Sequence, residues 1–168
     1  NRIRAFMQKN DQAGNLDWSK EVDQDNDGEW IHDMLESDDG GFVAVGYMGY
    51  GMMSDESQKG WIFKLNSTGT SIEWANTFSE AKAIVCIHPA SDGFMVAGQA
   101  ANEEDAWIAK LDSSGNPQWS KTIQGPGNDR ITDMTDAHDG GYVLAGYSSS
   151  GSDRDGWVIK IDSSGNLQ

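Results

Sequence analysis

Internal repetition restricts the fold of this chain more strongly than any other property of its sequence. One motif, Asp-Gly followed by alternating apolar residues and a closing Gly, occurs three times as DGGFVAVG, DGFMVAG and DGGYVLAG. A run led by tryptophan follows each copy, at Trp61, Trp107 and Trp157, and these residues are 46 and 50 positions apart. We therefore expect one structural unit of about 48 residues, repeated along the chain.

The repeats place residues 1–168 in a single repeat domain. Residues 1–18 end a partial unit, residues 18–74 form the first repeat, residues 74–119 the second, and residues 119–168 an incomplete third.

Each repeat contains four short runs of alternating apolar and polar residues, bounded by Gly, Asp, Asn and Ser. This pattern is typical of half-buried strands joined by turns. In the last repeat we expect strands at about residues 130–136, at Tyr142–Tyr147 and at Trp157–Ile161, with a fourth beginning at Leu167. Over the whole chain the pattern predicts an all-β fold of about 13 strands in four-stranded antiparallel units, the strand content of a propeller blade.

The last repeat, DGGYVLAGYSSSGSDRDGWVIKIDSSGNLQ, resembles the tandem β-propeller repeats of secreted and cell-surface proteins of bacteria and archaea. The ending D-x-x-G-x-x-x-W, as in DSSGNPQW, is similar to the tryptophan motif of quinoprotein-like propeller blades. The resemblance covers nearly the whole chain and implies a β-propeller segment of about three blades in an extracellular or envelope protein. Propellers close with about four to eight blades, so three imply a partial ring from a longer array or a ring completed by oligomerisation.

The chain carries 12 Lys and Arg against 27 Asp and Glu, a formal net charge of −15. This charge repels phosphate groups, which excludes nucleic acid and anionic membrane surfaces as partners. No apolar run approaches the roughly 18 residues that a membrane span needs. We expect the partner to be a protein or a glycan, in addition to self-association or further repeats.

Candidate binding residues are those that repeat packing does not require. Trp30 falls where the other repeats have Ala83 and Arg130, so we expect an exposed aromatic ring that stacks on a sugar or a protein partner. The stretch at residues 48–59 is longer than its counterparts and adds adaptable apolar side chains, namely Tyr50, Met52 and Met53. An ordinary surface insertion is the alternative for this stretch.

Asp33 and Asp133 occupy the same repeat position, which Cys86 fills in the second repeat. If the first strand is innermost, as in most propellers, these side chains line a central channel and are candidate ligand contacts. The alternative is a structural carboxylate that accepts backbone N–H groups from a neighbouring segment.

The run DQDNDGE has the D-x-D-x-D-G opening of calcium-binding loops. Its candidate Ca²⁺ ligands are Asp23, Asp25, Asp27 and Glu29. The position at which such a loop needs a bidentate Glu is Met34, so a plain turn between two strands is the competing interpretation. Ca²⁺ is the one cofactor candidate.

We therefore predict a non-enzymatic extracellular binding or scaffold module that uses non-repeated loops. One alternative is a carbohydrate-binding propeller, which would need an aromatic residue and an Asp or Asn set in every repeat. The other is a fragment of a quinoprotein-like oxidoreductase. The chain has three histidines, His32, His88 and His138. None of them is part of a recognised catalytic motif.

Overall fold

The computed structural model describes residues 4–23, 28–49 and 58–168. These residues form 13 strands and no helix, so the described part contains no helix that could span a membrane. The strands are β1 (Ala5–Asn10), β2 (Leu16–Val22), β3 (Glu29–Glu36), β4 (Phe42–Met48), β5 (Lys59–Leu65), β6 (Ile72–Phe78), β7 (Ala81–Ala90), β8 (Gly93–Ala100), β9 (Ala106–Asp112), β10 (Pro117–Ile123), β11 (Asn128–Asp136), β12 (Tyr142–Ser150) and β13 (Asp153–Ile161).

The strands make four antiparallel sheets in chain order, which confirms the all-β prediction and the expected strand number. The sheets are β1–β2, β3–β4–β5–β6, β7–β8–β9–β10 and β11–β12–β13. In the last repeat, β12 and β13 run further than the sequence predicted and make one long hairpin. A fourth strand begins to pair where it was expected, because Leu167 bridges Ile161.

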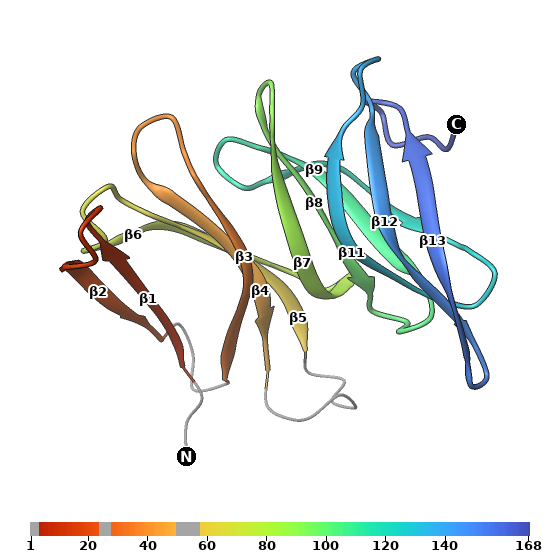
Figure 1. Cartoon of the computed structure of the whole chain (residues 1–168), viewed down its shortest axis with the longest axis horizontal. Coiled ribbons are helices and arrows are strands. Elements are labelled where there is room, and N and C mark those ends of the chain that lie inside the picture. The colour runs from red at the N-terminus through yellow and green to blue at the C-terminus, as the bar shows by residue number, and fades with distance from the viewer. Residues whose placement is uncertain (1–3, 24–27, 50–57) are drawn as a thin grey trace.

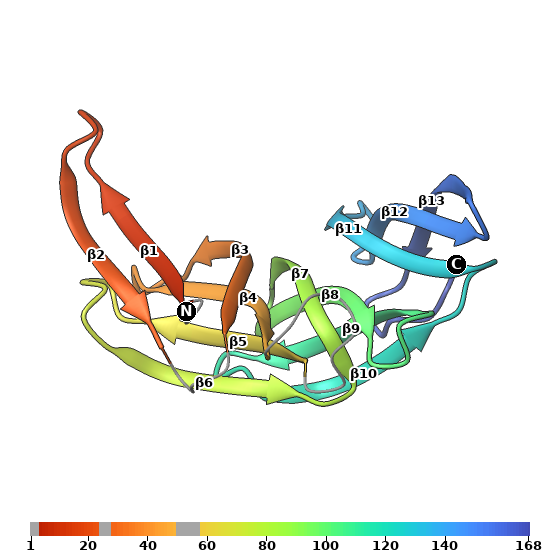
Figure 2. The same ribbon diagram turned by 90° about the horizontal axis from the view of Figure 1, so that it is seen from below.

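The four sheets stand in a row that does not close (Figure 1). Seen from below, the row is bowed, with β6 and β10 along its outer side (Figure 2). β7 contacts β3, β4 and β5, and β11 contacts β7, β8 and β9. The first strands of the last two sheets, β7 and β11, therefore each lie across the face of the sheet before them.

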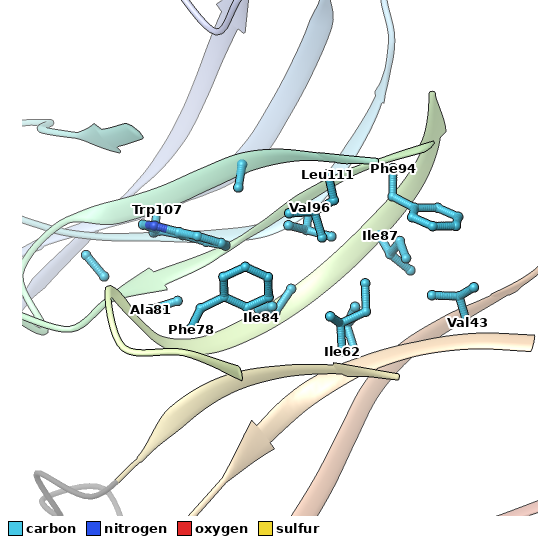
Figure 3. Close-up of a cluster of buried hydrophobic side chains, with 13 residues drawn as sticks. Val43, Ile62, Phe78, Ala81, Ile84, Ile87, Phe94, Val96, Trp107 and Leu111 are labelled. Atoms are coloured by element: carbon cyan, nitrogen blue, oxygen red, sulfur yellow. The ribbon is translucent and has the colours of Figure 1, made fainter. Parts of the chain in front are cut away.

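An apolar cluster fills each of the three spaces between consecutive sheets. In the middle space, Val43 and Ile62 face Ile84 of the next sheet (Figure 3). Neighbouring strand residues point to opposite faces, so Trp61 and Phe63 of β5 pack instead toward β1 and β2. In the two four-stranded sheets, the second and third strands are largely apolar because both of their faces are buried.

The first strand of every larger sheet has a bulge at one repeat position, and each bulge lies opposite a glycine. In the second repeat the register shifts between Ile84 and Cys86, where Ile84 pairs with Gly98. A Cβ atom at Gly98 would lie 2.0 Å from the carbonyl oxygen of Ala83, so no larger residue fits without moving the backbone. The close approach explains the closing Gly of the repeated motif, at Gly46, Gly98 and Gly146.

A second repeated contact joins consecutive sheets through their fourth and third strands. The ring of a fourth-strand tryptophan lies on the glycine of the next third-to-fourth-strand turn, and we call this the tryptophan–glycine contact. A Cβ at the glycine would lie 2.4 to 2.5 Å from the ring in each of the three pairs, Trp18 with Gly69, Trp74 with Gly115 and Trp119 with Gly165.

A polar side chain two residues after each tryptophan also donates into that turn. Lys20 Nζ reaches the Thr70 carbonyl at 3.3 Å, and Lys121 Nζ reaches the Ser164 carbonyl at 2.7 Å. In the middle pair the amide of Asn76 donates to the Gly115 carbonyl at 3.0 Å. The apolar and polar parts of this contact are therefore repeated together.

Two of the three turns that receive a tryptophan are closed by an aspartate. Asp112 Oδ1 accepts the backbone N–H groups of Ser114 and Asn116, both at 2.9 Å. These hydrogen bonds, the one from the Asn116 backbone foremost, hold the pKa of Asp112 below its ordinary value. Asp11 and Asp162 repeat the arrangement with lowered pKa values, whereas Asn66 takes this place in the first repeat.

Because Asp112 can be protonated and Asn66 cannot, the aspartate turns should make the stability of the chain depend on pH. The pKa of Asp112 is lower in the folded chain than its unfolded value of about 3.9, so its stabilising effect is complete above that pH and is lost as the pH falls further. An Asp112→Asn variant keeps an acceptor, as Asn66 does, but does not titrate. We expect the urea midpoint of the variant to fall less between about pH 5 and pH 2.5 than that of the unmodified chain.

Urea unfolding followed by tryptophan fluorescence at several pH values measures this difference. The control is Asp155→Asn, which removes the same charge from β13, outside the turns, and so separates the effect of net charge from that of the turn. Parallel pH profiles for Asp112→Asn and the unmodified chain would contradict the conclusion that the ionised Asp112 stabilises its turn.

Candidate functional site

Trp30 stands in β3 with 43% of its surface exposed. It pairs across the sheet with Tyr47 of β4, and the two rings stack with centroids 5.9 Å apart and planes at 18°. The ring of His32 lies on the same tyrosine, at 5.6 Å. We call Trp30, His32 and Tyr47 the aromatic cluster.

The aromatic cluster belongs to the first repeat alone. The position paired like Trp30 and Tyr47 holds Ala83 and Gln99 in the second repeat and Arg130 and Tyr147 in the third. In the third repeat the guanidinium of Arg154 lies over the tyrosine ring, at 4.7 Å. The repeat fold therefore forms without a tryptophan here.

Desolvation lowers the pKa of His32, so its imidazole is neutral at pH 7. The aromatic cluster thus presents an exposed indole and a neutral imidazole. Such a surface suits the apolar face of a sugar ring or an uncharged protein side chain.

The cluster lies where the non-repeated segments of the first repeat meet the sheet. The N–H of Gly49 donates to the Gly28 carbonyl at 3.1 Å, which ties the chain after β4 to the chain before β3. The predicted binding residues Tyr50, Met52 and Met53 lie outside the described residues. Trp30 is visible in the sequence as an exception to the repeat, whereas Tyr47 and His32 lie beside it only through the register of β3 on β4.

The three first-strand positions that follow the bulges lie near one another. Asp33 and Asp133 both add negative charge near Cys86, whose thiol pKa is raised to about 12, chiefly by burial. Cys86 is therefore a protonated thiol at neutral pH.

Asp33 accepts hydrogen bonds from two sheets. Its Oδ1 accepts the N–H of Met34 at 2.8 Å, and its Oδ2 accepts the N–H of Ile87, in the next sheet, at 3.0 Å. Asp133 Oδ1 accepts the N–H of the following residue, Met134, in the same way. Cys86 carries no carboxylate for Ile87, and Asp33 supplies it from the neighbouring sheet. The Asp33 carboxylate therefore accepts backbone N–H groups from its own strand and from the neighbouring sheet, as a structural role for this residue requires.

The candidate Ca²⁺ ligands are only partly within the described residues, because Asp25 and Asp27 lie outside them. Asp23 is 3.4 Å from the guanidinium of Arg4, and the side chain of Glu29 is buried. The carboxylates of Glu21, Asp23 and Glu29 all raise the pKa of Arg4, that of Glu21 foremost. A protein cation thus lies among these acids, and no group of three or more possible metal ligands occurs in residues 4–23, 28–49 and 58–168.

A groove of about 480 Å³ lies at the opposite end of the sheets, between the turns after β3 and β7. Glu36, Lys64 and Phe94 are among its lining residues, and Lys64 forms ion pairs with Asp39 and Glu73. A second groove of about 350 Å³ occupies the matching place between the next two sheets. Because the groove recurs with the repeat, its presence follows from the spacing of the sheets.

The hydrogen bonds of Asp33 predict unequal effects of two matched substitutions. Asp33→Ala leaves the Ile87 N–H without its acceptor between sheets and should lower the free energy of unfolding by about 1–3 kcal/mol. Asp133→Ala removes only a local bond and should cost less. Urea unfolding of both variants tests this prediction. Equal losses of stability would show that the hydrogen bond donated by the Ile87 N–H to Asp33 does not link the sheets.

No protein-family model matches this chain, and no curated protein matches its sequence.

Proposed function

We propose that this chain is a non-enzymatic binding module of an extracellular or envelope protein, built from β-propeller blades, and that the aromatic cluster is its contact surface. The single observation that carries the proposal is the exposed Trp30, held by stacking on Tyr47 at a position where the other repeats need no aromatic residue.

The sheet arrangement supports the propeller part of this proposal. Consecutive antiparallel sheets stack face to face, and the first strand of each crosses the sheet before it. The row is bowed rather than straight, with fourth strands β6 and β10 on its outer side (Figure 2). A longer array with the same bow would bring further sheets around toward a closed ring.

The aromatic cluster supports the binding part. An exposed tryptophan costs a folded protein solvation free energy unless a partner covers it, and aromatic residues are enriched where partners dock. The cluster is rigid because Trp30 and Tyr47 are cross-strand neighbours in a paired sheet. With a net charge of −15, the chain favours neutral or basic partners over polyanions.

The experiment is a binding screen on glycan and protein arrays with the unmodified chain and a Trp30→Ala variant. We expect the variant to lose a binding signal that the unmodified chain shows, by roughly tenfold or more, as for an aromatic residue at the centre of an interface. A signal on the glycan array would favour the carbohydrate-binding form of the module, and one on the protein array the scaffold form.

The matched control is Val158→Ala, which shortens another exposed apolar side chain, 69% exposed, in a different sheet. Thermal melts of both variants verify that they fold. Unchanged binding by Trp30→Ala, or equal loss by Val158→Ala, would overturn the assignment of the contact to the aromatic cluster.

A further inference from the structure

Among the described residues, four turns carry a glycine at the same repeat position, and three of them receive a tryptophan from the preceding sheet. The covered turns contain Gly69, Gly115 and Gly165, and the rings that cover them belong, in the same order, to Trp18, Trp74 and Trp119. The fourth turn, residues 11–15, contains Gly14, and no described residue lies within 4 Å of a Cβ placed there.

The turn at Gly14 already has the shape of the covered ones. Gly14 has φ +86°, close to the +75° of Gly115 and the +74° of Gly165. Asp11 Oδ1 accepts the N–H groups of Ala13 and Asn15 at 2.9 and 2.8 Å, as Asp112 and Asp162 do in their turns. The receiving surface is therefore formed before anything docks on it.

A second residue marks the same face of the β1–β2 hairpin. Phe6 holds the repeat position of Trp61 and Trp107, which are buried against the preceding sheet, at 0% and 1% exposed. Phe6 itself is 61% exposed, whereas its strand neighbours Ala5 and Met7 are buried toward the next sheet. Phe6 and Gly14 thus mark the face that a preceding sheet covers elsewhere in the chain.

We propose that this face docks the fourth strand of a further repeat of the same kind, one that carries a tryptophan with a lysine or asparagine two residues after it. The indole lies on Gly14, and the amine or amide donates to the turn, as Lys121 donates to the Ser164 carbonyl and to Asn166 Oδ1. By repeat position, its acceptors in the 11–15 turn are the Ala13 carbonyl and Asn15 Oδ1.

A second copy of the chain does not offer such a strand. Each fourth-strand tryptophan of the described residues already lies on a glycine of its own chain. The occupant is therefore a repeat outside these 168 residues, and its recognition chemistry is a flat indole beside a hydrogen-bond donor.

The test attaches the seven-residue sequence of Pro117–Ile123 ahead of residue 1 of the full chain, through a flexible Gly-Ser linker of about 15 residues. Such a linker spans about 20 Å, the length of β1, and raises the local concentration of the strand to the millimolar range. The readout is the Hα signals of the glycines by NMR, because a ring stacked on a glycine shifts them upfield.

We expect the signals of Gly69, Gly115 and Gly165 to be shifted upfield in the unmodified chain, and those of Gly14 to join them once the tether is present. The same tether with the Trp119→Ala change should leave Gly14 unshifted. Within the tethered chain, Gly14→Ala should return the ring-proton signals of the attached tryptophan to their positions in a free strand, whereas Gly140→Ala, at φ +83° and also in open space, should leave the Gly14 signals upfield.

Unshifted Gly14 signals in the tethered chain, with the three reference glycines still upfield, would overturn the proposal. An equal shift with the alanine tether would overturn it as well, since the effect would then not come from the indole.

Discussion

The packing of an indole ring on a bare glycine is the contact on which the order of the sheets depends. It recurs at three successive interfaces, and a lysine or asparagine two residues later donates into the same turn. A tryptophan side chain buries about 150–250 Å² when covered, which makes each contact a large apolar contribution between neighbouring sheets. Since every sheet after the first receives this contact from the sheet before it, the structure grows in one direction, and the two end sheets keep a face that nothing in the described residues covers.

At the repeated bulge, hydrogen bonds to carboxylates add to the apolar packing between the sheets. Each bulge draws the glycine of the second strand against the backbone of the first. The carboxylates of Asp33 and Asp133 each accept the N–H of the residue that follows them. Asp33 also accepts the N–H of Ile87, whose own repeat has Cys86 at the matching position. A substitution in one repeat is thus compensated by a side chain of its neighbour, which couples the two sheets beyond their apolar contact.

Much of this fold can be read from the sequence, because alternation, turn residues and repeat length all indicate the same strands. The alternation at Trp157–Ile161 and the repeated Asp-Gly turns predict β13 and the hairpins before it. What the sequence does not indicate is contact between residues far apart in the chain. The hydrogen bond that the Ile87 N–H donates to Asp33 joins two neighbouring sheets, and the stacking of Trp30 on Tyr47 depends on the register of β3 on β4. Trp30 was identifiable as an exception to the repeat, whereas its partners were not.

One pair of variants measures directly whether the tryptophan–glycine contact holds neighbouring sheets together. Gly115→Ala and Gly140→Ala place the same methyl group at nearly the same backbone angle, φ +75° and +83°. At Gly115 the new Cβ would lie 2.5 Å from the Trp74 ring, whereas at Gly140 it meets open space. Urea unfolding should show that Gly115→Ala loses about 1–3 kcal/mol more stability than Gly140→Ala, as expected for overpacking added to equal backbone strain. Equal losses for the two variants would show that the tryptophan–glycine contact does not hold neighbouring sheets together.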